Sequence, residues 1–205
     1  MVCRILIVQH GEKERQPGDP GLTASGRRQA ETTADWLLRN YSVSRIVSSP
    51  MRRAVETAAP LGAGSGVKPT TDDRLRERMN WNDSAEVSLD DFLAEWHQAS
   101  SDRSFVPRSG DSSQGAAERF LRTLRELADE ADDGDVVAVV AHGGVTVDSL
   151  RTLLGDDAVQ REHPDLIPNG VPCCAVTELL QNGDDWDVRW PTTVHLTQLA
   201  EHRPA

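Results

Sequence analysis

The chain has 205 residues, and its 33 Asp and Glu against 22 Lys and Arg give a formal net charge of −11 at pH 7. The length suits one domain with a three-layer core, and the acidic balance argues against nucleic acid, whose phosphates would be repelled over most of the surface. Because no apolar export segment precedes the first predicted strand and no apolar run is long enough to span a membrane, we expect a cytoplasmic protein without a membrane partner.

The elements predicted in chain order alternate between strands and helices. Short apolar runs predict strands at 3–8, 44–48, 67–71 and 136–141. Capping residues and helical spacing predict helices that begin after Thr23, at Pro50 (to about Ala59), after Ser88, at about Ser113 (to Glu130) and at Val145 (to Leu154). Residues 61–66 are predicted to be a loop, and Cys173 to Trp190 a closing hairpin that turns at Asn182-Gly183. This order predicts an α/β fold, a three-layer α/β/α sandwich with a mostly parallel central sheet.

Two histidine-glycine steps stand directly after predicted buried strands. His10-Gly11 follows the first apolar run, and His142-Gly143-Gly144 follows the run at 136–141. Either histidine alone fits a simple turn at the end of a strand. Ligands of open α/β sheets collect at the carboxyl ends of the strands, so the two imidazoles together predict one reaction centre.

A third motif places an arginine near a helix start. Ser49 before Pro50 is typical of an N-cap followed by proline at the first helical position. Free backbone N–H groups at such a start favour phosphate, and an arginine one turn in can add two parallel donors. We expect Arg53 to point into the phosphate pocket and Arg52 to lie on a solvated helix face.

Six short motifs, in this order along the chain, resemble those of the histidine phosphatase superfamily, whose fold is phosphoglycerate mutase-like. They are Val8-Gln9-His10-Gly11-Glu12, Gly21 to Ala30, Ser49 to Ala58, Leu75-Arg76-Glu77-Arg78, Gly110-Asp111-Ser112 and Ala141-His142-Gly143-Gly144. The resemblance covers most of the chain. It implies a single domain over residues 1–205, with a short, polar, substrate-covering insertion at about 81–110.

The resemblance implies a phosphatase that hydrolyses a small phosphomonoester through a phosphohistidine, without a metal or another cofactor. His10 attacks phosphorus, Glu77 protonates the leaving oxygen, and water then releases phosphate. An imidazole with its ordinary pKa of ~6.5 is partly neutral at cellular pH, which agrees with a histidine nucleophile. Asp111 is the second candidate for the proton donor.

Most of the barrier to phosphoryl transfer is lowered by donors around the equatorial oxygens. Arg53 and His142 are the predicted donors, with the backbone near Gly11 and Gly143 in support. Gln9 also belongs to this phosphate-binding set, although the family pattern has arginine at its position. A glutamine donates a hydrogen bond but supplies no charge and no two-pronged contact.

Gln9 is compatible with three situations. Another cation (Lys13, Arg15 or Arg78) replaces the charge, the natural substrate tolerates its loss, or the chain is a catalytically weak protein that binds a phosphate ester or another protein. Loss of one oxyanion donor typically costs ~10²–10³ in turnover, so reduced activity is also compatible with an enzyme. The candidate substrate-binding residues are Lys13, Arg15, Thr23 and Arg78.

Two other enzyme classes are alternatives. Phosphoglycerate mutase-type transfer needs a phosphorylated intermediate to persist while the substrate reorients, and the short insertion disfavours it. A metallohydrolase would use His10, Glu12 and His142, but no close His/Asp spacing supports a metal. The three cysteines form neither a disulfide framework nor a metal-binding spacing.

Overall fold

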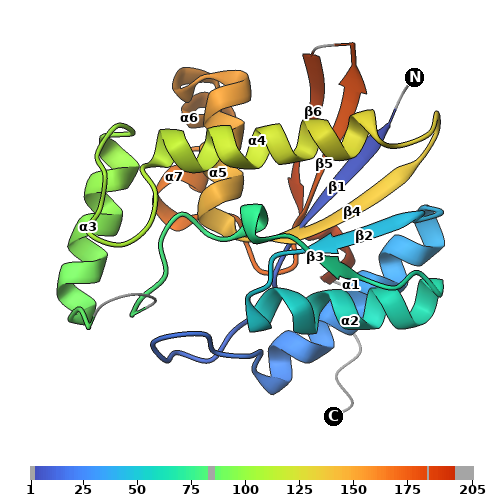
Figure 1. Ribbon diagram of the computed structural model, residues 1–205, viewed down its shortest axis with the longest axis horizontal. Coiled ribbons are helices and arrows are strands. Elements are labelled where there is room, and N and C mark those ends of the chain that lie inside the picture. Colours follow the sequence, from blue (N-terminus) through green and yellow to red (C-terminus); the bar gives the residue numbers. More distant parts are fainter. Residues whose placement is uncertain (1–2, 83–85, 184, 197–205) are drawn as a thin grey trace.

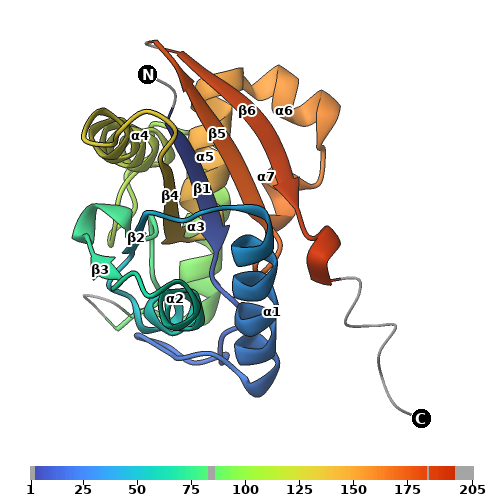
Figure 2. The ribbon, with the colours of Figure 1, turned by 90° about the vertical axis from the view of Figure 1, so that its right-hand side faces the viewer.

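The computed structural model describes residues 3–82, 86–183 and 185–196, and within them one six-stranded sheet carries helices on both faces (Figures 1 and 2). The strand order is β3-β2-β4-β1-β5-β6. The strands are β1 (Arg4–Gln9), β2 (Arg45–Ser48), β3 (Thr70–Thr71), β4 (Val136–Ala141), β5 (Val176–Asn182) and β6 (Asp185–Thr192). Strands β3, β2, β4 and β1 pair in parallel, whereas β5 and β6 are antiparallel to their neighbours, so the predicted mostly parallel sheet is confirmed.

Two pairs of helices cover the two faces of the sheet. The first layer holds α1 (Ala24–Asn40) and α2 (Arg52–Ser65), and the second holds α4 (Ser113–Asp129) and α5 (Gly143–Leu154). Helix α3 (Leu89–Ser101) stands apart from both layers at one end of the molecule (Figure 1). None of the helices in the described ranges is long and apolar enough to cross a membrane.

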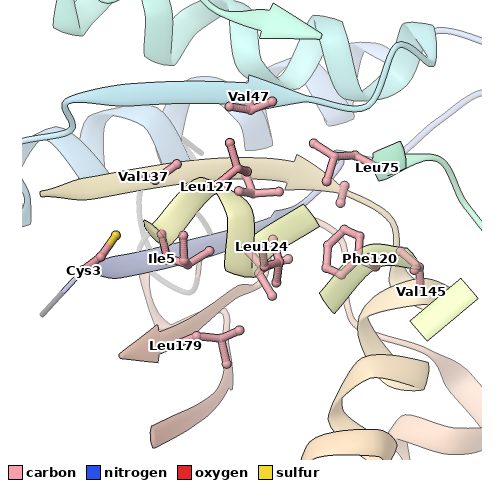
Figure 3. Close-up of a cluster of buried hydrophobic side chains, with 14 of the residues drawn as sticks. Cys3, Ile5, Val47, Leu75, Phe120, Leu124, Leu127, Val137, Val145 and Leu179 are labelled. Carbon is pink, nitrogen blue, oxygen red and sulfur yellow. The ribbon is translucent and has the colours of Figure 1, made fainter. Parts of the chain in front are cut away.

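Strand β4 is apolar throughout, and β1 is apolar between Arg4 and Gln9, because both faces of these strands are buried. In β1, Ile5 and Ile7 pack against α4 and α5, while Leu6 and Val8 pack against α1 and α2. Figure 3 shows part of the first cluster, in which Phe120 of α4 lies near Leu75 and Val145. The helices are therefore fixed on both sides of the strands that end at the two histidines.

Helix α2 differs from its prediction at both ends. It begins at Arg52 with Met51 as its N-cap, so Pro50 precedes the helix. It also continues through Pro60, so the predicted loop at 61–66 is wrong. Leu61, within the predicted loop, is buried in the cluster that contains Leu6 and Val8 of β1, which favours continuation of the helix. The helix ends at Ser65, and Gly66, whose φ is +75°, is its C-cap.

Three further elements were not predicted, and all are short. They are the 3₁₀ turn Asp73–Leu75 and the helices α6 (Asp156–Glu162) and α7 (Leu166–Asn169). The predicted strand at 67–71 is reduced to β3. The helix caps at Thr23 and Ser88 and the closing hairpin are confirmed.

Candidate active site

The pairing of β1 with β4 brings the two distant histidines together. In this parallel register Gln9 is opposite Ala141, and the backbone N–H of His10 donates to the Ala141 carbonyl at 3.1 Å. His10 and His142 each follow one residue later, at the same edge of the sheet. Their ring centroids lie 5.3 Å apart in an edge-to-face arrangement.

His10 is held as a neutral imidazole. Its Nδ1 lies 2.8 Å from the Gly11 carbonyl oxygen, which can only accept, so Nδ1 carries the hydrogen and Nε2 keeps its lone pair. Burial, followed by the nearby positive charge of Arg53, lowers the pKa of His10 to about 3. The side-chain amide of Gln9 lies 3.4 Å from His10 Nε2. At neutral pH the geometry is that of a nitrogen nucleophile.

His142 is fully buried beside it. Its Nε2 lies 2.7 Å from Ser49 Oγ, and Ser49 Oγ in turn accepts from the backbone N–H of Met51 at 3.4 Å. The Ser49 hydroxyl can both accept and donate, so this contact is compatible with a hydrogen on either ring nitrogen of His142. Burial and Arg53 both hold the pKa of His142 well below its ordinary value. His142 can therefore act as an uncharged donor.

Ser49 is a site residue that sequence reasoning treated only as a helix cap. It lies directly after β2, the strand next to β4, and its backbone N–H donates to Val140 at 2.8 Å. Its position after a central strand, like that of the two histidines, was the available signal. The structure shows that its hydroxyl holds a histidine ring instead of capping α2.

The side chain of Arg53 is buried and that of Arg52 is exposed, as the sequence predicts. The Arg53 side chain is 3% exposed, and its Nη1 lies 3.9 Å from Asp19 Oδ1. The Arg52 side chain is 63% exposed and pairs with Glu56. The backbone N–H of Arg52 donates to the Asp19 carboxylate, so this carboxylate occupies the start of α2 where the sequence predicts phosphate.

Glu77 is anchored by the first turn of α5. Its two carboxylate oxygens accept from the backbone N–H groups of Gly144 at 2.8 Å and Val145 at 2.7 Å. A Cβ at Gly144 would lie 2.7 Å from Glu77 Oε1 and 2.6 Å from the Trp96 ring, so only glycine leaves room for both side chains. The helix that begins after His142 thus fixes the position of Glu77.

A cavity of about 450 Å³ adjoins several of these groups, although the fully buried His142 does not line it. Among the predicted site residues, those that line it are His10, Lys13, Arg15, Arg53 and Glu77. Burial, followed by the charge of Arg53, lowers the pKa of Lys13. The cavity has a size typical of a small-molecule site.

Two predicted substrate-binding residues do not reach this cavity. The Arg78 guanidinium is buried and makes two hydrogen bonds to Asp148, at 2.9 and 3.1 Å. The Thr23 hydroxyl accepts from Gly26 N–H as the α1 cap and donates to Glu12 at 2.8 Å. The sequence prediction for both residues is corrected accordingly, because each has its polar groups engaged within the fold.

Gly11 and Gly143, the two predicted phosphate-contacting glycines, both pack closely within the fold. The Gly11 backbone N–H donates to Thr57 Oγ1 at 3.0 Å, and a Cβ at Gly11 would lie 2.5 Å from the Gly26 carbonyl oxygen. Close packing against α1, and not an approach to phosphate, therefore requires this glycine. A Cβ at Gly143 would lie 3.3 Å from the Gln9 amide nitrogen, so Gly143 packs beside Gln9.

The remaining alternatives for the site have less geometric support. Asp111 forms an ion pair with Arg119 at 2.8 Å and does not line the cavity. Over the described ranges, no group of three His, Cys, Asp or Glu side chains is placed to hold a metal ion. Glu12, which the metallohydrolase alternative needs, accepts from Thr23 instead.

Paired histidines, an arginine and a carboxylate at the carboxyl edge of an α/β sheet are the arrangement of a phosphoryl-transferring enzyme. The family model of the histidine phosphatase superfamily (branch 1) matches residues 5–192, and the chain belongs to this family. It has the phosphoglycerate mutase-like fold and is a phosphoric monoester hydrolase.

Individual relatives agree with this assignment. Glucosyl-3-phosphoglycerate phosphatase of Mycolicibacterium vanbaalenii is 32% identical over 170 residues, 75% of each chain. Phosphoglycerate mutase-like protein 4 of Arabidopsis thaliana is 30% identical over 214 residues, 96% of this chain and 88% of the relative. A solved mycobacterial glucosyl-3-phosphoglycerate phosphatase with inorganic phosphate has a TM-score of 0.72 at 27% identity, covering 94% of this chain and 98% of that one.

The lowered pKa of His10 gives the first prediction. An NMR titration of the ring signals should show His10 predominantly neutral from pH 7 down to about pH 4, because its pKa is about 3 and the charged form becomes the major one only below that value. Arg53→Gln should raise this pKa, since it removes a nearby positive charge. The matched substitution Arg52→Gln, on the exposed face of α2, should leave it unchanged. A midpoint near the ordinary value of ~6.5 in the unmodified protein would contradict the description of His10.

Proposed function

We propose that this chain hydrolyses a small phosphomonoester through a phosphohistidine formed on His10 Nε2, without a metal. The observation that carries the proposal is the state of His10: a neutral ring, with Nδ1 donating to Gly11, lines the same cavity as Arg53 and Glu77. A lone pair on Nε2 beside a fixed cation is what attack on a phosphoryl group requires.

The reaction proceeds in two steps. His10 Nε2 forms a bond to phosphorus while the bond from phosphorus to the ester oxygen breaks, and Glu77 gives its proton to that leaving oxygen. Water then attacks the phosphohistidine and gives a proton to Glu77, so that inorganic phosphate and neutral His10 are restored. Arg53 and His142 stabilise the charge on the equatorial oxygens in both steps.

Lys13 supplies the charge that Gln9 lacks. Gln9 is buried beside His10, where the family pattern has arginine, and it offers one amide to the phosphoryl group. Lys13 supports this role because it lines the same cavity as His10 and Arg53. Arg78, a buried cation that the sequence also offers for this role, is paired with Asp148.

Removal of the nucleophile tests the proposal directly. His10→Ala should reduce phosphate release from a generic aryl phosphate to the uncatalysed background, because His10 contributes the one imidazole among the described residues that line the cavity. The exposed His97 on α3 provides a matched control, and His97→Ala should keep the full rate. Equal rates for unmodified protein and His10→Ala would contradict the proposal, as would isomerised product without free phosphate from a phosphoglycerate.

The role of Lys13 has its own test. Lys13→Ala should lower kcat/KM by about 10²–10³, the usual effect of losing one donor to the transferred group. Adding Gln9→Arg to that variant should restore a large part of the loss, because the charge returns at the neighbouring position. Lys68→Ala, at an exposed position just after α2, should have no effect. Unchanged kcat/KM in Lys13→Ala would show that the charge comes from another residue.

A further inference from the structure

One side of the active-site cavity is apolar. Leu89, Phe92, Leu93 and Trp96, which we call the α3 wall, follow one another at the spacing of one helix face and all line the cavity. In the sequence, the helical spacing of Phe92, Leu93 and Trp96 favours packing over a ligand site. Instead, Ala99 is the buried residue of α3 in the part of the chain described, and Leu89 and Leu93 are 46% and 42% exposed. Large apolar side chains left open at a cavity indicate a ligand surface.

The α3 wall is supported from behind. The Arg78 guanidinium stacks on the Trp96 ring, with its central carbon 4.0 Å from the ring centroid, and Asp148 holds that guanidinium with two hydrogen bonds. The Phe92 ring lies 6.1 Å from Trp96. The guanidinium that stacks on Trp96 is itself held by Asp148 of α5. The position of Trp96 in the α3 wall is therefore fixed before a ligand arrives.

The α3 wall also lies beside the proposed proton donor. A Cβ at Gly144 would touch both Glu77 Oε1 and the tip of the Trp96 ring, so these two side chains approach the same backbone atom. Glu77 protonates the leaving oxygen in the proposed reaction. Because Glu77 and Trp96 also line the same cavity, we expect the group attached to that oxygen to lie near Trp96.

The polar lining residues belong mainly to a different segment. Lys13, Arg15 and Gln16 come from the loop after β1, which also carries the nucleophile. Asn80 donates its amide to the Gly18 carbonyl at 2.7 Å, and Trp81 donates its ring N–H to the Val87 carbonyl at 2.8 Å. Hydroxyl groups placed against the α3 wall would lose water without gaining hydrogen bonds.

We infer that the substrate is a phosphomonoester whose leaving group has an aromatic or aliphatic body that lies against the α3 wall, in preference to a sugar or glycerol phosphate. The inference rests on the proposed function, because it takes Glu77 as the residue next to the leaving oxygen. The cavity of about 450 Å³ is large enough for such a body beside the phosphate. Burial of apolar surface against the α3 wall supplies the preference.

A matched pair of esters tests the inference. 2-Phenylethyl phosphate and glycerol 3-phosphate both release a primary alcohol, so their intrinsic reactivities are similar and kcat/KM compares the fit of the leaving group. We expect kcat/KM to be at least about tenfold higher for the phenylethyl ester, since even one methylene in an apolar pocket is worth about 10- to 200-fold. Leu93→Ser should reduce this ratio severalfold. Val106→Ser, at a 70% exposed side chain outside the cavity lining, should leave the ratio unchanged.

The outcomes separate the inference from the proposed function. Hydrolysis of both esters with equal kcat/KM, or a preference for glycerol 3-phosphate, would overturn the inference and leave the phosphatase mechanism intact. A tenfold preference that persists in Leu93→Ser would also overturn it, because the α3 wall would then not be its source. Failure to release phosphate from either ester or from an aryl phosphate would instead reject the proposed function, and the inference with it.

Discussion

The parallel pairing of β1 with β4 is the constraint on which the active site depends. The register that places Gln9 opposite Ala141 puts His10 and His142 side by side, although 131 positions separate them in the sequence. A slip of one residue would turn every side chain of the strand to the opposite face. Because Ile5 and Leu6 already pack into different clusters, such a slip would exchange the residues of both cores. The packing that stabilises the fold therefore also fixes the position of the two imidazoles.

Arg53 sets the electrostatics of the same region. Burial is the largest cause of the lowered pKa values of His10, His142 and Lys13, and the charge of Arg53 is the second cause in each. Burial together with the Arg53 guanidinium thus keeps both histidines neutral before a phosphate arrives. A phosphate brings negative charge that offsets this effect. In the proposed mechanism, one cation therefore prepares the nucleophile and then binds the group that it attacks.

Local signals in the sequence predicted much of this arrangement. The apolar runs before His10 and His142, and the caps at Thr23 and Ser88, depend on neighbouring residues, so they could be read without the fold. The sequence alone could not predict that α2 continues past Pro60, because the contacts that stabilise this part of the helix come from outside it.

The roles of several other residues depend on contacts with residues far away in the sequence, which no local pattern could predict. Arg78 pairs with Asp148, 70 residues away, and no local pattern distinguishes that partner from a substrate phosphate. The spacing of Phe92, Leu93 and Trp96 indicates an apolar helix face, but a face that packs into a core and a face that lines an open cavity have the same spacing. In the sequence, Gly11 is similarly compatible with close packing or with a phosphate-binding loop. Only the structure, which places Gly26 beside Gly11, distinguishes the two.

A phosphoenzyme carried by His10 is the central claim, and rapid quenching with base during turnover of an aryl phosphate tests it most directly. Because base preserves phosphohistidine, mass spectrometry should find one phosphoryl group on the peptide that contains His10, and ³¹P NMR should assign it to Nε2. Continued hydrolysis without a phosphorylated protein, or with the phosphoryl group on a different residue, would contradict the account.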